Sequence, residues 1–178
     1  MLVVASPCAD LTSYAWILAY SLGYFVVDSC LVVGFYAQFR QAWSTIVHHI
    51  VVMLGLCLTA YYAVQEVWFC GLMAMFFMTE MSTPLVNARW FMHTAKAAKL
   101  GLPLLLTQVA LLLVFFHFRI WAIPKQYMTV VEYLPKLYAL GGFALSGTVS
   151  LAALALAILN SYWFALMLWI GIKQVVVN

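Results

Sequence analysis

Two adjacent histidines, His48 and His49, lie near the start of an apolar stretch that reads IVHHIVVMLGL from Ile46 to Leu56. An imidazole can serve as a general acid, a general base or a nucleophile, and it is also a common metal ligand. Consecutive residues of a helix point about 100° apart, so the two rings cannot easily chelate one metal ion. The pair therefore predicts acid–base or acyl-transfer chemistry, with binding of a lipid headgroup as the alternative.

Further polar side chains interrupt the apolar segments on either side of the histidine pair. They are Asp28, Glu80, Asn87, Arg89 and Asn160. A charged group at the centre of a bilayer costs at least about 2.5 kcal/mol, so these groups need partners. We expect one shared polar cavity, in which each acid hydrogen-bonds an imidazole, His48 and His49 are the candidate catalytic residues and the other five bind substrate.

Structural roles remain open for several of these residues. Glu80 could instead form a surface ion pair with Arg89, Asp28 could cap or bond a neighbouring helix, and Asn160 could bridge two helices as amides often do in membranes. Passive packing is a weaker alternative for His48 and His49, because two imidazoles need two sets of partners.

The composition indicates an integral membrane protein. Of the 178 residues, 67% are hydrophobic and only 7% are charged, whereas soluble domains carry roughly 25% charged residues. The net charge of +3 without a basic run of five residues predicts no nucleic-acid partner. Four histidines without an HxxH box and the absence of a GxSxG motif predict neither a metal centre nor a serine hydrolase. We expect no cofactor, and cysteines that are reduced structural thiols.

Apolar segments long enough to span a bilayer recur along the chain. They predict an all-α polytopic transmembrane helix bundle that forms a single domain over residues 1–178, with about five spans and a partial sixth as an alternative. The expected spans cover about 14–35, 45–64, 67–81, 100–118 and the apolar run 138–172. That last run would be about 50 Å long as one helix, which predicts either a steep tilt or a half-span over 140–150 followed by a full span over 151–172. Residues 120–136, with Pro124 and Pro135, predict an interfacial loop, with or without a short helix.

Basic residues are divided unevenly between the two sides of the predicted bundle. Five fall on the side to which the histidine pair is nearest, namely Arg40, Arg89, Lys96, Lys99 and Lys173. Three fall on the other side, namely Arg119, Lys125 and Lys136. Because cytoplasmic flanks are enriched in Lys and Arg, the histidine side is predicted to be cytosolic.

Small residues recur every three or four positions along the last apolar run. They are Gly142, Ser146, Ser150, Ala153, Ala157 and Ser161. Such a ridge lets two helix backbones approach closely in lipid. It predicts a packing seam inside the bundle, with a homodimer face as the alternative.

Three stretches of the chain together resemble the TLC domain family. The first is Asp28 followed by WSTIVHH at 43–49, the second is TEMSTPLVNARW at 79–90, and the third is LNSYWF at 159–164, continuing to Gly171 and Lys173. This family includes the translocation-associated membrane proteins, the ceramide synthases and smaller TLC-domain-containing lipid regulators.

The resemblance implies a function in membrane lipids. In the ceramide synthase branch a histidine pair transfers an acyl group from acyl-CoA to a sphingoid amine inside a membrane-buried helical barrel, a role that would fall to His48 and His49. The acidic pair of that branch has no match here, and the 79–90 stretch is more similar to the smaller proteins, which are linked to phospholipid composition.

From this resemblance we expect a lipid-homeostasis protein of the endoplasmic reticulum that binds acyl lipids without turnover. An acyl-CoA-dependent acyltransferase acting on a lipid amine or hydroxyl is the alternative, with acyl-CoA as its substrate, and a transporter or channel is weaker. The family usually has one or two more helices before the Asp28 span, so we also expect a chain shortened at its N-terminus.

Overall fold

The protein is helical throughout the described ranges. The computed structural model describes residues 11–38, 41–63, 65–94 and 101–177, and no strand occurs in these segments. The elements in chain order are α1 (Leu11–Gly34), η1 (Tyr36–Gln38), α2 (Ala42–Tyr62), α3 (Val67–Phe77), η2 (Met78–Ser82), α4 (Thr83–Thr94), α5 (Gly101–Phe115), η4 (Phe116–Trp121) and α6 (Ile123–Val177). The predicted all-α class is confirmed.

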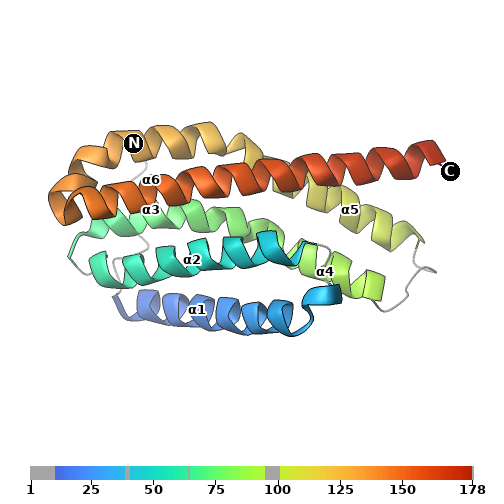
Figure 1. Ribbon diagram of the computed structural model, residues 1–178, viewed down its shortest axis with the longest axis horizontal. Helices are drawn as coiled ribbons and strands as arrows, with labels where there is room; N and C mark the ends of the chain where they lie inside the picture. Colours follow the sequence, from blue (N-terminus) through green and yellow to red (C-terminus); the bar gives the residue numbers. More distant parts are fainter. Residues whose placement is uncertain (1–10, 39–40, 64, 95–100, 178) are drawn as a thin grey trace.

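The helices form an elongated bundle whose members run roughly along one axis (Figure 1). Helix α2 packs between α1 and α6, and α4 packs against α5. Two short irregular helices connect the longer ones without breaking them. The 3₁₀ helix η2 joins α3 to α4, and the π-helix η4 follows directly on α5.

Within the described residues, four helical stretches are long and apolar enough to cross a membrane, which supports an integral membrane protein. They are Tyr14–Gly34, Ala42–Tyr62, Val67–Met92 and Gly101–Gly171. The fourth stretch has 71 residues and would be about 105 Å long if straight, several times the ~30 Å hydrocarbon core of a bilayer. The count of five spans therefore stays a prediction that depends on how this stretch folds back.

The fourth stretch reverses direction inside α6 at Gly141 and Gly142 (Figure 1). Gly142 has φ 62°, a left-handed conformation that favours glycine. A Cβ added at Gly141 would lie 2.6 Å from the Leu145 Cβ and 2.9 Å from the Tyr62 hydroxyl oxygen. The reversal therefore needs both glycines. After it the chain continues as one helix to Val177, so the half-span predicted over 140–150 is not seen.

The predicted interfacial loop over 120–136 is wrong, because this segment is helical. It comprises the end of η4 and the first part of α6. Pro124 lies in the first turn of α6, where its missing N–H has no intrahelical partner to lose. Pro135 lies inside the helix, so neither proline breaks it.

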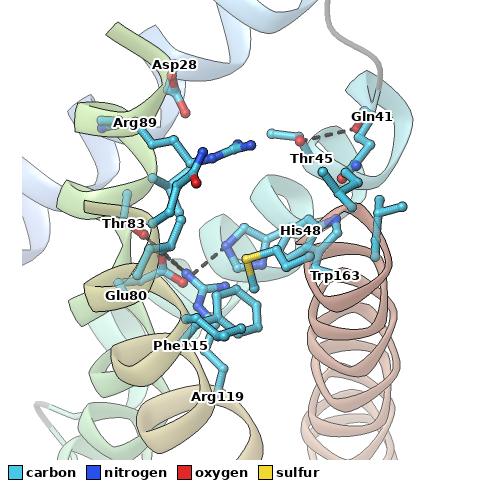
Figure 2. Close-up of a pocket in the computed structure, with 18 of the residues that line it drawn as sticks. Asp28, Gln41, Thr45, His48, Glu80, Thr83, Arg89, Phe115, Arg119 and Trp163 are labelled. Atoms are coloured by element: carbon cyan, nitrogen blue, oxygen red, sulfur yellow. Dashed lines mark hydrogen bonds and ion pairs between the residues drawn. The ribbon is translucent and has the colours of Figure 1, made fainter. Parts of the chain in front are cut away.

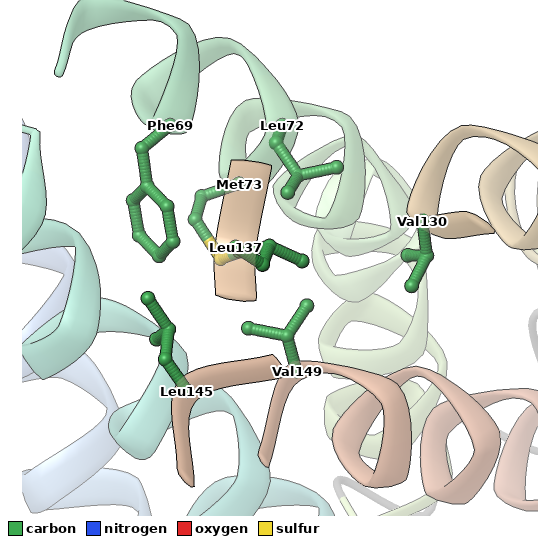
Figure 3. Close-up of a cluster of buried hydrophobic side chains, with 7 residues drawn as sticks. All are labelled: Phe69, Leu72, Met73, Val130, Leu137, Leu145 and Val149. Atoms are coloured by element: carbon green, nitrogen blue, oxygen red, sulfur yellow. The ribbon is translucent and has the colours of Figure 1, made fainter. Parts of the chain in front are cut away.

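A buried apolar cluster holds α3 against both parts of α6 (Figure 3). Its members come from α3 before η2 and from α6 on either side of the reversal. They are Phe69, Leu72, Met73, Val130, Leu137, Leu145 and Val149. Large apolar side chains such as Leu113 and Phe143, which are 63% and 83% exposed, lie on the outside, as expected where lipid is the solvent.

The cysteines differ in part from the prediction of reduced thiols. Cys30 and Cys57 are free, but Cys70 near the start of α3 is disulfide-bonded. Cys8 lies outside the described residues. The prediction was wrong for Cys70 because an apolar sequence context does not show which thiols meet in space.

Candidate functional site

A cavity of about 560 Å³ opens in the part of the bundle where α2 begins and the last part of α6 ends (Figure 2). Its volume is within the ~300–1,000 Å³ typical of small-molecule sites. Asp28 and Arg89 lie near one end of the view in Figure 2, and Phe115 and Arg119 lie near the other. The cavity is lined by six of the seven predicted site residues, Asp28, His48, His49, Glu80, Asn87 and Arg89.

His48 is held by one ring nitrogen and leaves the other unpaired. Its Nε2 lies 3.1 Å from Glu80 Oε1, and its ring packs edge-on against Trp163 at a centroid distance of 5.2 Å. The buried Nδ1 has no hydrogen-bond partner within the described part of the chain. With Nε2–H donated to the carboxylate, Nδ1 carries a lone pair that could accept a proton or attack a carbonyl carbon.

His49 is held by both ring nitrogens. Its Nε2 lies 3.3 Å from Asp28 Oδ2, and its Nδ1 lies 3.0 Å from Ser29 Oγ. The Ser29 hydroxyl, which has one proton, lies 2.6 Å from the Phe25 carbonyl oxygen and donates to it. Under this arrangement Nδ1 is the donor to Ser29 Oγ, and Nε2 faces the Asp28 carboxyl group.

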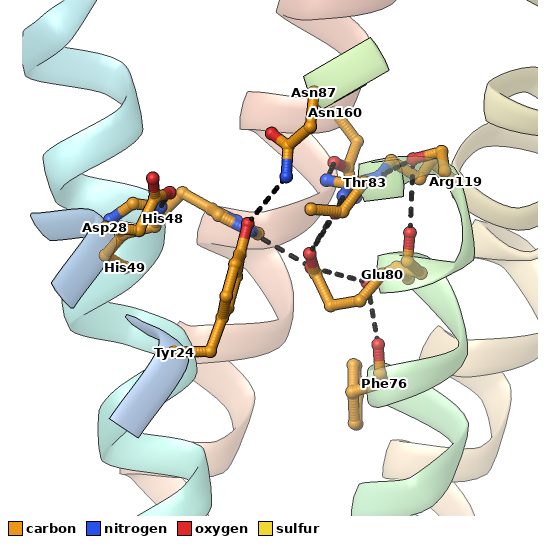
Figure 4. A network of polar contacts seen from close by, with 12 residues as sticks. Tyr24, Asp28, His48, His49, Phe76, Glu80, Thr83, Asn87, Arg119 and Asn160 are labelled. Atoms are coloured by element: carbon orange, nitrogen blue, oxygen red, sulfur yellow. Dashed lines mark hydrogen bonds and ion pairs between the residues drawn. The ribbon is translucent and has the colours of Figure 1, made fainter. Parts of the chain in front are cut away.

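The two adjacent histidines are therefore not equivalent. Their ring centroids are 5.9 Å apart, and they pair with acids from different elements, α1 and η2 (Figure 4). The predicted pairing of each imidazole with one acid is confirmed. Within the described residues, no group of three or more His, Cys, Asp and Glu is placed to hold a metal ion.

Arg119 is a central member of the network, although the sequence interpretation placed it at the opposite interface. Its side chain is 3% exposed, and its Nη2 lies 3.1 Å from Glu80 Oε2. It also donates to Ser82 Oγ at 2.8 Å and to Thr83 Oγ1 at 3.2 Å. The ion pair considered for Glu80 with Arg89 is thus formed with Arg119 instead.

This pairing was missed because a span was expected to end at Phe118, whereas the chain continues from α5 through η4 into α6. Arg119 lies inside η4, and a π-turn changes the direction in which side chains leave the helix. Continuing the α-helical period of the preceding apolar run therefore does not predict the direction in which the Arg119 side chain points. The available signal was chemical, because a carboxylate in an apolar segment needs a cation and Arg119 directly follows a predicted span.

Asn160 and Asn87 serve different parts of the same site. Asn160 Oδ1 accepts a hydrogen bond from Arg119 Nη1 at 3.1 Å, and Asn160 is 1% exposed and is not part of the cavity wall. Asn87 lines the cavity and donates from Nδ2 to the Tyr24 hydroxyl at 3.1 Å (Figure 4). The proposed helix-bridging role of Asn160 is thereby supported more directly than a role in binding substrate.

Sequence reasoning did not single out several hydroxyl-bearing and aromatic residues of the site. They are Tyr24, Ser29, Ser82, Thr83 and Trp163, together with Ser44, which accepts a hydrogen bond from Trp163 Nε1 at 3.0 Å. Such residues are common in membrane helices, so type alone gave no signal.

Most of the apolar part of the cavity wall comes from α5 and the end of α6. It includes Leu105, Val109, Leu112, Leu166, Met167 and Ile170. Polar groups of α1, α2, η2 and α4 line the same cavity. A ligand that fits both must carry an apolar chain and a polar group.

Comparison with known proteins agrees with this architecture. A family model described as the TLC domain matches residues 6–169. TLC domain-containing protein 4-A from Xenopus laevis is 28% identical over 183 aligned residues, which cover 91% of this chain and 67% of that protein. TLC domain-containing protein 4 from Xenopus tropicalis gives the same identity and coverage. No solved structure matches the chain significantly. Because the family model spans nearly its whole length, the chain belongs to the TLC domain family.

Proposed function

We propose that this protein acts in membrane lipid homeostasis by binding acyl lipids in the cavity beside the histidine pair. The observation that carries the proposal is the cavity itself, which has a largely apolar wall from α5 and α6 and a hydrogen-bonded polar wall from the other elements. An acyl chain fits the first wall and a lipid headgroup fits the second. Bound lipid would replace water that the apolar wall cannot hydrogen-bond.

Filling the cavity tests this function. Leu112 lines the cavity, whereas its neighbour Leu113 is 63% exposed on the outside of α5. We expect Leu112→Trp to lose the acyl lipids that co-purify with the wild type in a mild detergent, as measured by native mass spectrometry. Leu113→Trp is the matched control and should retain them. Equal lipid content in both variants and the wild type would contradict the proposal.

An acyltransferase is the second candidate, and one specific observation favours it. The Nδ1 of His48 is unpaired while Glu80 orients the opposite edge of the ring. A nucleophile or base whose ring is oriented by a third group is the arrangement that acyl transfer uses. Acyl-CoA would be the donor, and a lipid amine or hydroxyl would be the acceptor.

Lipid profiles distinguish the two candidates. In cells that express His48→Ala, an enzyme should lose at least ~10²-fold in rate and change the acyl composition of ceramides or phospholipids. A binding protein should leave the product ratios unchanged. Retained membrane insertion and retained co-purified lipid are the controls, and an unchanged acyl profile would remove the acyltransferase.

We place the protein in the endoplasmic reticulum, with the cavity open toward the cytosol. Arg119 belongs to the buried network. Of the three basic residues predicted on the side opposite the histidine pair, only Lys125 and Lys136 therefore remain in the comparison of the two membrane sides. The disulfide-bonded Cys70 is near the start of α3, at the end of the bundle away from the cavity (Figure 1), and disulfides persist in oxidising compartments. A fluorescent tag at the C-terminus should be digested by protease after selective permeabilisation of the plasma membrane. Protection of that tag would reverse the orientation.

A further inference from the structure

The charged groups of the cavity leave one cation without a counterion. Asp28 pairs with His49, and Glu80 pairs with both His48 and Arg119. Arg89, partly buried in α4, also lines the cavity. No ion pair or hydrogen bond joins Arg89 to any residue within the described ranges. The anionic groups of the site are thus already engaged, and the Arg89 guanidinium is not.

Neutral amide groups that line the same cavity as Arg89 can help to bind an anion. Gln41, Asn87 and Gln108 line the same cavity, and each carries an amide NH₂ group with two donors. One of these donors, on Asn87, is used by the Tyr24 hydroxyl. The guanidinium offers five N–H donors in a planar fork that matches phosphate oxygens.

We infer that Arg89 is the anion-binding group of the cavity and that the ligand is an acyl lipid that carries a phosphate. This inference rests on the proposed function, because it assigns a headgroup class to the acyl lipid of the same cavity. The phosphate pairs with Arg89 between the polar groups of α2, α4 and α5, and the acyl chain lies along Leu105, Val109 and Leu112. The phosphate neutralises the cavity-lining guanidinium that has no counterion among the described residues.

Two kinds of lipid carry this chemistry, namely a phospholipid and an acyl-CoA. The test titrates the full chain in a neutral detergent with three ligands that share one acyl chain: a lysophosphatidylglycerol, an acyl-CoA and an uncharged monoacylglycerol. Binding is followed by the fluorescence of the protein's tryptophans. Wild type should bind at least one phosphate-bearing lipid about tenfold or more tighter than the monoacylglycerol, a difference of about 1.4 kcal/mol. The phosphate-bearing lipid that binds more tightly shows whether the ligand of the cavity is a phospholipid or an acyl-CoA.

Variants of Arg89 decide whether this preference comes from the guanidinium. Arg89→Gln should bind all three lipids about equally, and Arg89→Lys should keep part of the preference because it keeps the charge without the fork. Lys125→Gln removes an exposed cation that does not line the cavity, and it should match the wild type. Added salt should weaken the wild-type preference, since Coulomb attraction is screened.

The outcomes separate this inference from the proposed function. A wild type without preference for phosphate, or a preference that survives in Arg89→Gln, overturns the role of Arg89. If monoacylglycerol still binds and Leu112→Trp abolishes that binding, the proposed binding of acyl lipids is supported although Arg89 has no role in it. If no lipid binds in a manner sensitive to Leu112→Trp, the proposed function itself fails.

Discussion

Replacing Arg119 with methionine should strongly destabilise the bundle. Methionine keeps an unbranched apolar stem but removes the cation and all four donated hydrogen bonds, to Ser82, Asn160, Glu80 and Thr83. The Glu80 carboxylate then remains charged and mostly buried, without a cation, and keeps only the His48 ring and the hydroxyls of Thr79 and Thr83 as partners.

The expected size of the effect follows from two independent considerations. Interhelical hydrogen bonds in membranes contribute on average about 0.6 kcal/mol each, so the four bonds of Arg119 give roughly 2.4 kcal/mol. Breaking a buried ion pair by removing one partner costs about 3–5 kcal/mol, because it strands a charge. We therefore expect a loss of about 2–5 kcal/mol, and a fall of at least about 5 °C in Tm for a chain of this size.

Thermal unfolding in detergent, followed by fluorescence-detected size exclusion, measures this change. Lys125→Met is the control, because it also converts a cation to methionine but at an exposed position outside the cavity. The double variant Arg119→Met with Glu80→Gln should be at least as stable as Arg119→Met alone, since the second change neutralises the stranded carboxylate. If Arg119→Met unfolds at the same temperature as Lys125→Met, or if the two site substitutions are simply additive, the network does not stabilise the fold as argued.

The same assay tests three local features of the bundle. Leu137→Ala should cost about 2–5 kcal/mol, because Leu137 is fully buried between α3 and α6, whereas Leu113→Ala on the lipid-facing surface should cost much less; equal losses would place the core elsewhere. Gly142→Ala should cost roughly 1–2 kcal/mol, because φ is 62° there and L-residues disfavour it, while Gly147→Ala in regular helix should be neutral or stabilising; a neutral Gly142→Ala would contradict the reversal. Trp163→Phe removes the donor to Ser44 and should cost about 0.6–1.7 kcal/mol, and an unchanged Tm would show that this bond is not formed.

Much of the candidate site followed from one physical constraint that acts on sequence alone. Ionisable groups in apolar segments need partners, so Asp28, Glu80 and the two histidines were expected to meet, and they do. Counting polar residues by depth worked for these groups because each lies in a regular helix or next to one. The same method misplaced Arg119, because it ended a span at Phe118, whereas the chain continues through η4 into α6 and keeps Arg119 inside the bundle.

The sequence by itself determined the solvent, the helical class and the family, because apolar composition, span-length segments and ordered motifs are properties of the chain read one residue at a time. The tertiary structure decided which acid pairs with which histidine, that Arg119 rather than Arg89 binds Glu80, and that the chain reverses at Gly141 and Gly142. These outcomes depend on how helices dozens of residues apart in sequence rotate and pack against one another. Side-chain partners in a bundle are set by that rotation, which no local pattern specifies.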